Sequence, residues 1–284
     1  MPVEPPVESP RLLADAYAMI AAGSWRPIAG GTDLLVQITG ELGPPPEQVI
    51  DLWGLDELRG ISVSDGWLTA GALTTYSALR SSAVVRDHLP VLAEAAATIG
   101  AVQIQNRGTI GGNIANASPA GDSLPVLLAT DAVIVLGGTR GERDVAASVF
   151  FTGYRRTARA DDELVIRVRF PLPAGRQVRF RKVGTRRAQA ISKVVLALSW
   201  RTDDVGRWRD TRVALGSVAE RPIRSGAAEA ALEGALPTRE TAAATAAAVA
   251  AEIKPIDDVR STAAYRRAVT AKVLHRLVRD AGGW

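Results

Sequence analysis

A glycine-rich stretch at residues 107–122 constrains the fold more than any other feature of the sequence. It reads Arg-Gly-Thr-Ile-Gly-Gly-Asn-Ile-Ala-Asn-Ala-Ser-Pro-Ala-Gly-Asp. Glycines weaken a strand and leave it little to pack, so this is not an ordinary buried strand. Glycine instead allows close backbone approach, which lets consecutive N–H groups converge on an anion. We therefore expect an anion-binding loop or, as the plainer alternative, a tight turn whose small residues serve packing.

A shorter stretch of the same character lies at residues 27–34 and reads Pro-Ile-Ala-Gly-Gly-Thr-Asp-Leu. Two glycine turns with flanking hydroxyls can grip a pyrophosphate from two sides without a metal ion. For either stretch alone the packing alternative stays open, because short motifs give false matches.

Several well-known motifs are missing from the sequence. No two glycines stand two positions apart, which excludes the Gly-x-Gly-x-x-Gly fingerprint, and there is no Gly-Lys-Ser/Thr or Gly-x-Ser-x-Gly sequence. The absence of cysteine excludes disulfides, iron–sulfur ligation and thiol catalysis, and the two histidines, His88 and His275, argue against an imidazole metal site. We expect no catalytic acid–base residue and no metal ligand, and a cofactor held by non-Rossmann loops.

The first 53 residues predict a small parallel β-α-β unit. A helix is expected to begin at Ser9-Pro10, with serine as N-cap and proline in the first turn, and to end at Gly23. Strands are predicted at residues 25–29 and 48–52, on either side of a helix at residues 33–39. Alternating helices and strands of this kind are typical of parallel pairing.

From residue 54 the pattern predicts a mixed region with a largely antiparallel sheet. The expected elements are strands at 67–73, 132–136 and 164–170, a long helix at 83–100, a short helix at 124–129, a hairpin from Gly137-Gly138 toward 143–146, and a loop at 150–156. The proline- and glycine-bearing segment 171–175 predicts a domain boundary. Beyond it we expect strands at 177–183, 193–201 and 208–216, then helices at 225–232, 238–253 and 261–280.

Together the two glycine stretches resemble the FAD-binding loops of the flavoprotein (medium) subunit of molybdenum hydroxylases, the xanthine dehydrogenase and carbon monoxide dehydrogenase family. The resemblance rests on residues 29–34, 105–115 and 117–122, and continues through Phe150–Arg155. It implies an α+β fold. A two-part FAD-binding domain of the PCMH type would occupy residues 1–173, with subregions of about 1–53 and 54–173. A C-terminal domain of antiparallel sheet plus helices would follow at 176–284.

The resemblance also implies a function and partners. The chain would carry electrons from the iron–sulfur clusters of a partner, through noncovalently bound FAD, to an acceptor such as NAD, a quinone or oxygen. The implied partners are a molybdopterin-containing large subunit and a 2Fe-2S small subunit, in an (αβγ)n assembly. Flavin electron transfer needs no protein acid or base, in agreement with the shortage of catalytic residues.

By the same resemblance the cofactor-binding residues form two segments and four separate positions. They are Ile28, Ala29, Gly30, Gly31, Thr32, Asp33 and Leu34; Thr109, Ile110, Gly111, Gly112 and Asn113; and Ile99, Asp122, Val165 and Lys182. In both segments the glycine N–H groups are expected to face the pyrophosphate, with threonine hydroxyls beside them.

Individual roles follow from the resemblance, with alternatives. Asp33 either caps the following helix or accepts a bond from a ribityl or ribose hydroxyl; Asp122 either contacts the ribose, which the resemblance favours, or caps the next helix. Ile99 flanks the adenine side and Val165 lies over the isoalloxazine ring. Lys182 lies near the flavin edge, where its charge would raise the flavin potential, or is a surface residue of a basic strand.

Two other functions are considered. A stand-alone NAD(P)H-dependent FAD reductase on the same fold needs a substrate pocket with a proton donor, and the sequence offers no such group. An RNA or nucleotide binder rests only on the pI of 9.7, yet the net charge is +4 and the aromatic residues are dispersed, so no nucleic-acid partner is expected. There is no apolar run long enough for a membrane span and no signal-peptide pattern, so we expect a cytoplasmic location.

Overall fold

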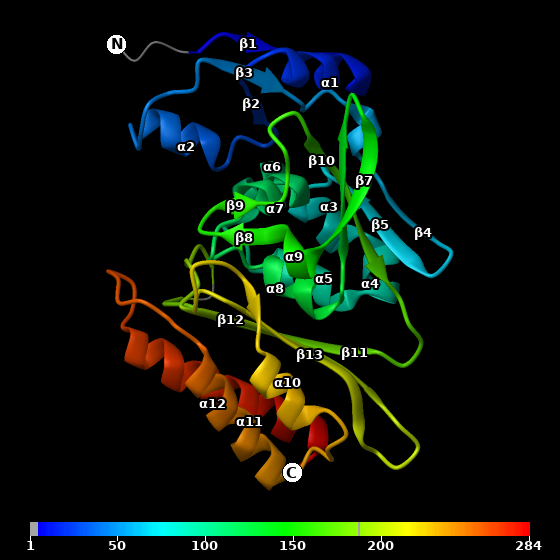
Figure 1. Cartoon of the computed structure of the whole chain (residues 1–284), viewed down its shortest axis with the longest axis vertical. Coiled ribbons are helices and arrows are strands. Elements are labelled where there is room, and N and C mark those ends of the chain that lie inside the picture. The colour runs from blue at the N-terminus through cyan, green and yellow to red at the C-terminus, as the bar shows by residue number, and fades with distance from the viewer. Residues whose placement is uncertain (1–4, 187) are drawn as a thin grey trace.

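Three main sheets, each with its own helices, follow one another along the long axis of the molecule (Figure 1). The computed structural model describes residues 5–186 and 188–284. We refer to the three parts as the N-terminal unit (5–53), the middle unit (54–173) and the C-terminal unit (from 176). The predicted α+β fold class, ending in an antiparallel sheet with helices, is confirmed.

The N-terminal unit is a three-stranded parallel sheet in the order β1-β3-β2. Its elements are β1 (Val7–Glu8), α1 (Leu13–Ala22), β2 (Trp25–Ile28), α2 (Leu34–Thr39) and β3 (Gln48–Asp51). The predicted parallel pairing is confirmed, but the predicted helix start at Ser9-Pro10 is wrong. The helix begins at Leu13, whose N–H donates 3.1 Å to Glu57 Oε1, so a carboxylate distant in sequence replaces the local cap.

The middle unit is built on a five-stranded antiparallel sheet in the order β4-β5-β10-β6-β7; the antiparallel pairing was predicted, the strand order was not. Its strands are β4 (Ile61–Ser64), β5 (Trp67–Gly71), β6 (Val133–Gly138), β7 (Gly141–Ala146) and β10 (Leu164–Pro171). Around it lie η1 (Asp56–Leu58), α3 (Tyr76–Ser81), α4 (Ala83–His88), α5 (Pro90–Ala97), α6 (Val102–Arg107), α7 (Ile110–Asn116), α8 (Leu124–Ala129), α9 (Ala147–Phe150), β8 (Phe151–Gly153) and β9 (Arg156–Thr157).

Three predictions for the middle unit are wrong. The long helix at 83–100 is two helices, α4 and α5, because Pro90 lacks an N–H and begins a new helix. Residues 150–156 are not a loop but the end of α9 and the β8–β9 hairpin. Half of the glycine-rich stretch at 107–122, expected to be a loop or turn, is helical, because the Thr109 side chain caps α7 and the glycines Gly111 and Gly112 lie inside this helix.

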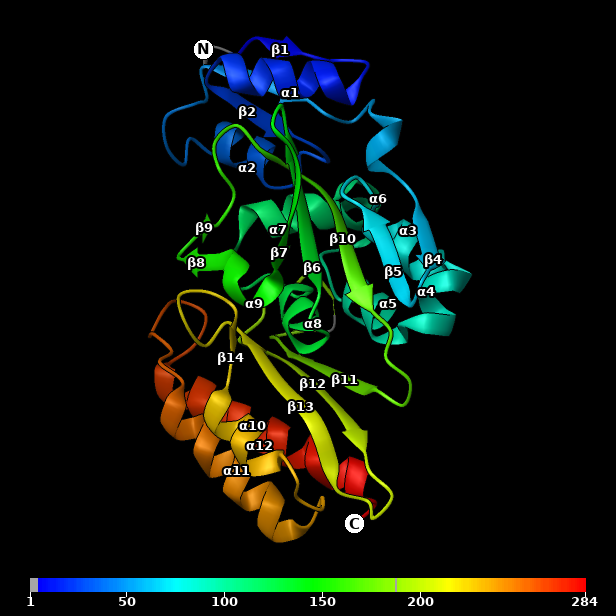
Figure 2. The same ribbon diagram turned by 45° about the vertical axis from the view of Figure 1, so that its right-hand side comes forward.

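The C-terminal unit pairs a four-stranded antiparallel sheet with three helices that lie on one face of it (Figure 2). The elements are β11 (Gln177–Val183), β12 (Val194–Thr202), β13 (Trp208–Gly216), β14 (Ile223–Arg224), α10 (Gly226–Leu232), α11 (Arg239–Glu252) and α12 (Ala263–Gly282). Strand β12 is buried on both faces. Val195 and Ala197 join the core of the middle unit, whereas Leu196 and Leu198 face the helices of the C-terminal unit.

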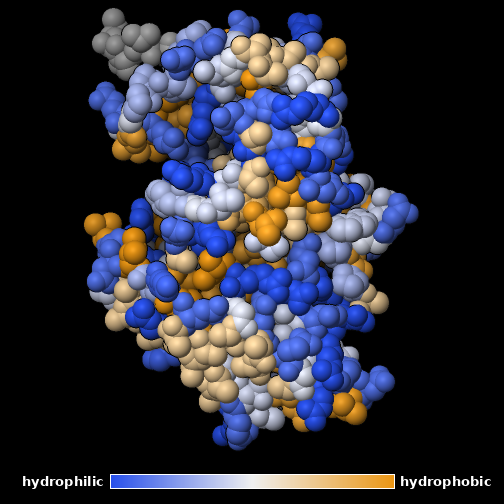
Figure 3. All heavy atoms as spheres, viewed as in Figure 1, coloured by the Kyte–Doolittle hydropathy of each residue, from blue (hydrophilic) through white to orange (hydrophobic). Residues whose placement is uncertain are grey.

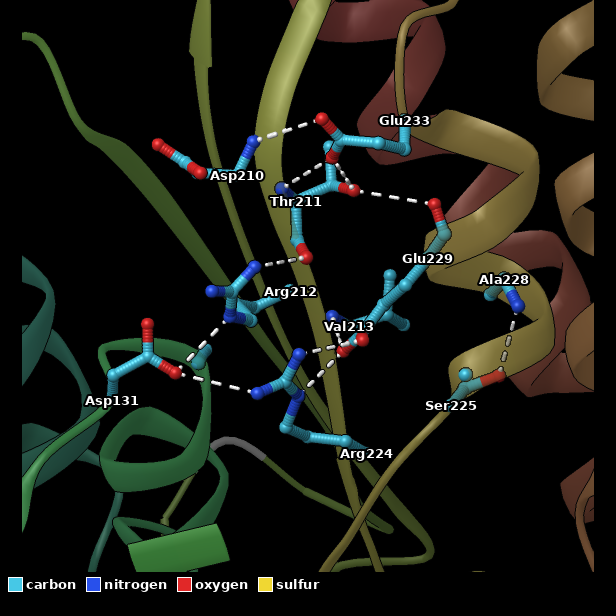
Figure 4. Close-up of polar contacts among 12 residues, drawn as sticks. Asp131, Asp210, Thr211, Arg212, Val213, Arg224, Ser225, Ala228, Glu229 and Glu233 are labelled. Atoms are coloured by element: carbon cyan, nitrogen blue, oxygen red, sulfur yellow. Dashed lines mark hydrogen bonds and ion pairs between the residues drawn. The ribbon is translucent and has the colours of Figure 1, made fainter. Parts of the chain in front are cut away.

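A cluster of ion pairs fastens the C-terminal unit to the middle unit (Figure 4). Asp131, which follows α8, lies 3.1 Å from Arg212, 3.3 Å from Arg224 and 3.2 Å from Arg176. Arg224 also makes two hydrogen bonds of 2.7 Å to Glu229 on α10, so the cluster reaches the helical layer. A bidentate arginine–carboxylate pair fixes the relative orientation of the two side chains and also stabilises the contact between them.

Hydrophobic residues on the face shown in Figure 3 form separate patches between hydrophilic ones. Within the described residues, no helix combines the length and the apolar character that crossing a membrane requires.

Candidate cofactor site

A pocket of about 230 Å3 lies where the N-terminal unit meets the middle unit. Its walls come from the segment after β2, the start of α2, the first turn of α7, and the start of β10. Thirteen of the sixteen predicted cofactor-binding residues line it: Ile28, Ala29, Gly30, Gly31, Thr32, Asp33, Leu34, Ile99, Thr109, Gly111, Gly112, Asn113 and Val165. Two segments far apart in the sequence therefore lie on one cavity.

The first segment, residues 28–34, connects β2 to α2 and supplies free backbone donors. Within residues 5–186 and 188–284, none of the N–H groups from Gly30 to Leu34 has a hydrogen-bond partner. Gly30 lies so close to the end of α6 that a Cβ there would be 1.7 Å from the Arg107 carbonyl oxygen, so only glycine fits. Asp33 is the N-cap residue of α2 but makes no side-chain capping bond, so the capping alternative for Asp33 is wrong.

The second segment, residues 109–113, differs from the first because the N–H groups of Gly111, Gly112 and Asn113 already donate hydrogen bonds within the protein. Gly111 N–H donates 2.9 Å to the Ala72 carbonyl, Gly112 N–H donates 3.1 Å to Thr109 Oγ1, and Asn113 N–H donates to the Thr109 carbonyl. A Cβ on Gly111 would be 2.5 Å from the Ala72 Cβ, whereas a Cβ on Gly112 would meet only Thr109 Oγ1. Gly111 therefore permits packing against Ala72, and Gly112 leaves open space at the pocket wall.

Three predicted residues do not line the pocket. Ile110 is fully buried in the core of the middle unit. Asp122 and Lys182 form a buried ion pair of 2.5 Å behind the wall, and Lys182 Nζ also donates 2.8 Å to the carbonyl of Thr98, next to the pocket residue Ile99. The alternative of a surface lysine is wrong, since the Lys182 side chain is only 9% exposed.

Asp122 keeps one unused acceptor. Burial raises the pKa of its carboxyl group, and the charge and hydrogen bond of Lys182 oppose that shift. Its Oδ2 is bound by Lys182, but Oδ1 is buried and has no hydrogen-bond partner among the described residues. Helix α8 begins after Ser123 without a side-chain capping bond, so the alternative in which Asp122 caps that helix is wrong.

Some pocket residues escaped the sequence analysis. Arg159 donates 2.7 Å to each of the carbonyls of Ala160 and Glu163, and burial lowers the pKa of its guanidinium. Arg26 and Tyr76 also line the pocket. Arg26 is close in sequence to the first segment, so its place at the pocket could have been predicted. No nearby sequence motif indicates that Arg159 or Tyr76 lines the pocket.

Two protein-family models cover almost the whole chain. Residues 3–173 match the FAD binding domain in molybdopterin dehydrogenase, and residues 179–281 match the CO dehydrogenase flavoprotein C-terminal domain. The chain belongs to the molybdopterin dehydrogenase flavoprotein family. It is an FAD-binding subunit of an oxidoreductase, and the predicted family and cofactor are confirmed.

Relatives of this flavoprotein extend over nearly its full length. It is 34% identical to the glyceraldehyde dehydrogenase medium chain of Sulfolobus acidocaldarius, covering 88% of this chain and 87% of the relative. It is 33% identical to the carbon monoxide dehydrogenase medium chain of Hydrogenophaga pseudoflava, covering 96% and 95%. A solved carbon monoxide dehydrogenase structure from Hydrogenophaga pseudoflava, which lacks the Mo-pyranopterin moiety, superposes with a TM-score of 0.93 at 33% identity over 97% and 96% of the two chains.

The pocket of this flavoprotein fits FAD on its own chemistry. The row of N–H groups at residues 30–34, which have no partner among the described residues, lies on the pocket wall and suits a pyrophosphate. Asp122 Oδ1 is a buried acceptor without a hydrogen-bond partner among the described residues, but Asp122 does not line the pocket and so does not test the fit. Gly30 lets the first segment approach the end of α6, and Gly112 leaves open space at the opposite wall.

Proposed function

We propose that FAD binds noncovalently in the pocket between the N-terminal and middle units, held by the residues predicted from the sequence. The observation that carries this proposal is the row of N–H groups from Gly30 to Leu34 that have no partner in the part of the chain that the structure describes. These groups would donate to the pyrophosphate, with the Thr32 hydroxyl beside them. On the opposite wall Gly112 would give the phosphates room, and Val165 and Ile99 would contact the ring systems.

Asp122 and Lys182 would act from behind the wall. The Asp122 carboxylate is held by Lys182, which also binds the Thr98 carbonyl, so the pair would support the wall at Ile99; the ribose contact of Asp122 stays a prediction. Lys182 would add positive charge near the flavin, although its ammonium group is already shared between Asp122 and the Thr98 carbonyl. We therefore assign Lys182 mainly to holding Asp122 and the Thr98–Ile99 segment in place.

The flavoprotein passes electrons through FAD for a molybdenum-containing dehydrogenase. Bound FAD supplies a ring that takes up and releases electrons, and the residues of the pocket bind and orient it. We propose that the electrons come from iron–sulfur clusters of a small subunit and, before that, from a molybdopterin-containing large subunit, in an (αβγ)n assembly. NAD, a quinone or oxygen would accept them. The division at 1–173 and 176–284 and the cytoplasmic location stay predictions.

A stand-alone reductase is not favoured. The relatives are named as medium chains or FAD-binding subunits of dehydrogenases, such as the xanthine dehydrogenase FAD-binding subunit of Escherichia coli O157:H7, 33% identical over 279 residues. Their names place them in multi-chain enzymes.

The test begins with the purified chain. We expect a bound-flavin absorbance spectrum, and acid treatment should release all of the flavin as FAD. Recovery of FMN, or flavin that stays on the denatured protein, would contradict noncovalent FAD. Co-expression with the neighbouring genes should yield a complex that contains molybdenum and iron, and substrate turnover by the single chain would revive the reductase alternative.

A further inference from the structure

Three polar side chains form a buried chain of hydrogen bonds beneath the pocket. They come from different segments: Tyr76 begins α3, Asn113 lies in α7, and Ser123 precedes α8. The Tyr76 hydroxyl lies 3.3 Å from Ser123 Oγ, and Ser123 Oγ lies 2.9 Å from Asn113 Oδ1. Tyr76 and Ser123 are buried, whereas Asn113 is half-buried, and both Tyr76 and Asn113 line the pocket.

The direction of these bonds follows from which atoms carry protons. Asn113 Oδ1 can only accept, so the single proton of Ser123 Oγ is donated to it. A lone pair of Ser123 Oγ is then left to accept the proton of Tyr76. Burial holds the pKa of the Tyr76 hydroxyl well above its ordinary value, so this hydroxyl keeps its proton.

Fixing the amide oxygen also fixes the amide nitrogen. Because Oδ1 of Asn113 is turned toward Ser123, Nδ2, which lies in the same plane on the other side of Cγ, points away from Ser123. The backbone N–H groups of Gly111, Gly112 and Asn113 already donate within the protein. This wall of the pocket therefore lacks backbone donors at these three residues, and the Asn113 side chain can supply one.

We propose that Tyr76 and Ser123 are positioning residues that lock the Asn113 side chain as a hydrogen-bond donor toward an oxygen atom of FAD. The inference rests on the proposed binding of FAD in this pocket. The adjacent Asp122 takes no part in the relay, because among the described residues Tyr76 and Ser123 make no hydrogen bond to it and its Oδ2 is bound by Lys182. A buried relay with fixed protons holds one orientation and lowers the cost of ordering the amide on binding.

The experiment measures FAD affinity and thermal stability separately. The variants are Ser123→Ala, Tyr76→Phe and the double variant, and the apo-proteins are titrated with FAD by the quenching of flavin fluorescence. We expect about tenfold weaker binding for Ser123→Ala and about threefold for Tyr76→Phe. The double variant should bind about as weakly as Ser123→Ala alone, because the two residues act in series.

Three further variants test the proposal from other sides. Ser199→Ala removes an equally buried hydroxyl, which donates to the Ala129 carbonyl, and should lower the melting temperature without changing FAD affinity. Asn113→Asp replaces the donor by an anionic acceptor and should weaken binding more than Asn113→Ala does.

The outcomes separate this inference from the proposed function. If the wild-type chain does not bind FAD, the proposed function fails. If it binds FAD but Ser123→Ala stays within twofold of it, or if the effects of Ser123→Ala and Tyr76→Phe add fully, the relay is overturned. Equal binding by Asn113→Asp and Asn113→Ala would overturn the donor role of Asn113.

Discussion

The two junctions of this molecule are built in opposite ways. Between the N-terminal and middle units lies a cavity, crossed at its edge by the contact of Gly30 with the end of α6 and by the Arg107 guanidinium 3.7 Å from the centre of the Trp53 ring. Between the middle and C-terminal units the space is filled, by a shared hydrophobic core and by the arginines around Asp131.

The difference shows that one junction of the chain is suited to binding a cofactor, whereas the other holds two units together. At the filled junction Asp131 pairs with three arginines and β12 is buried on both faces, and the structure shows no pocket there among the described residues. The hollow junction keeps the N–H groups of Gly30 to Leu34 without partners among the described residues, so its stability should increase when a ligand binds there. Mutations at the first junction should therefore change cofactor content, and mutations at the second should change stability.

The largest effect is expected at the hollow junction. In Gly30→Val the new side chain would overlap the Arg107 carbonyl, so the two walls move apart and FAD content should fall more than tenfold. Flavin absorbance per mole of purified chain measures this. Gly54→Val is the matched control, because a Cβ there has no atom within 4 Å and flavin should be retained. Full flavin content in Gly30→Val would show that the close approach is dispensable.

At the filled junction we expect the reverse outcome. Asp131→Asn keeps the shape and the left-handed backbone conformation (φ 53°) but leaves Arg176, Arg212 and Arg224 without their common carboxylate. The free energy of unfolding should fall by about 2 kcal/mol and the melting temperature by roughly 4–8 °C. FAD per folded chain should stay at the wild-type level. Calorimetry measures the melting temperature, and flavin absorbance measures the FAD content. Loss of flavin at unchanged stability would contradict the separation of the two junctions.

Lys182 links the two junctions, since it lies on β11 and holds Asp122 behind the pocket wall. In Lys182→Met the Asp122 carboxyl loses its counter-charge, and its pKa, already raised by burial, should rise further. A raised pKa means that folding favours the protonated acid, so stability should be present at low pH and fall as the pH rises through that pKa. Melting temperatures between pH 5 and pH 8 should therefore fall more steeply in the variant than in the wild type. Parallel curves would show that Asp122 does not depend on Lys182.

The smallest effect concerns the turn that holds Arg159 at the pocket. Two hydrogen bonds from Arg143, of 2.6 and 2.7 Å, hold the pKa of Glu163 below its usual value of 4.5. The stabilisation is therefore present above pH 4.5 and lost as the pH falls through the lower pKa of the folded state. Glu163→Gln should lower the free energy of unfolding by about 1 kcal/mol at pH 7 and by less at pH 3. Urea unfolding at the two pH values measures this difference. An equal cost at both pH values would contradict this pairing.

The sequence predicted the strands well because their signals are local. Strands β11 and β13 have the predicted bounds, and the parallel and antiparallel pairings follow from the order of elements. The start of α1 was missed because its N-terminal N–H is bound by Glu57, 44 residues away. The helix in the glycine-rich stretch was missed because glycine has a low helix propensity. In α7, Gly111 is required because a side chain there would collide with Ala72.

The same contrast holds for the site. The two segments were predictable because glycine at Gly30 and Gly112 leaves a visible pattern in the sequence. The pairing of Asp122 with Lys182 spans 60 residues, and no periodicity indicates it. Arg159 faces the pocket only because the turn after β9 folds back beside β10.

The two-sided burial of β12 also bears on how the chain is synthesised. The core of the middle unit is completed by Phe180, Val195, Ala197 and Ala214, all of which leave the ribosome after residue 173. Until then the side of α8 that packs on β12 and β13 has no partner. A nascent chain arrested before β12 therefore exposes apolar surface, and such intermediates associate with chaperones or with one another. The N-terminal and middle units, about three-fifths of the chain, therefore reach their final packing only after the C-terminal sheet has been synthesised.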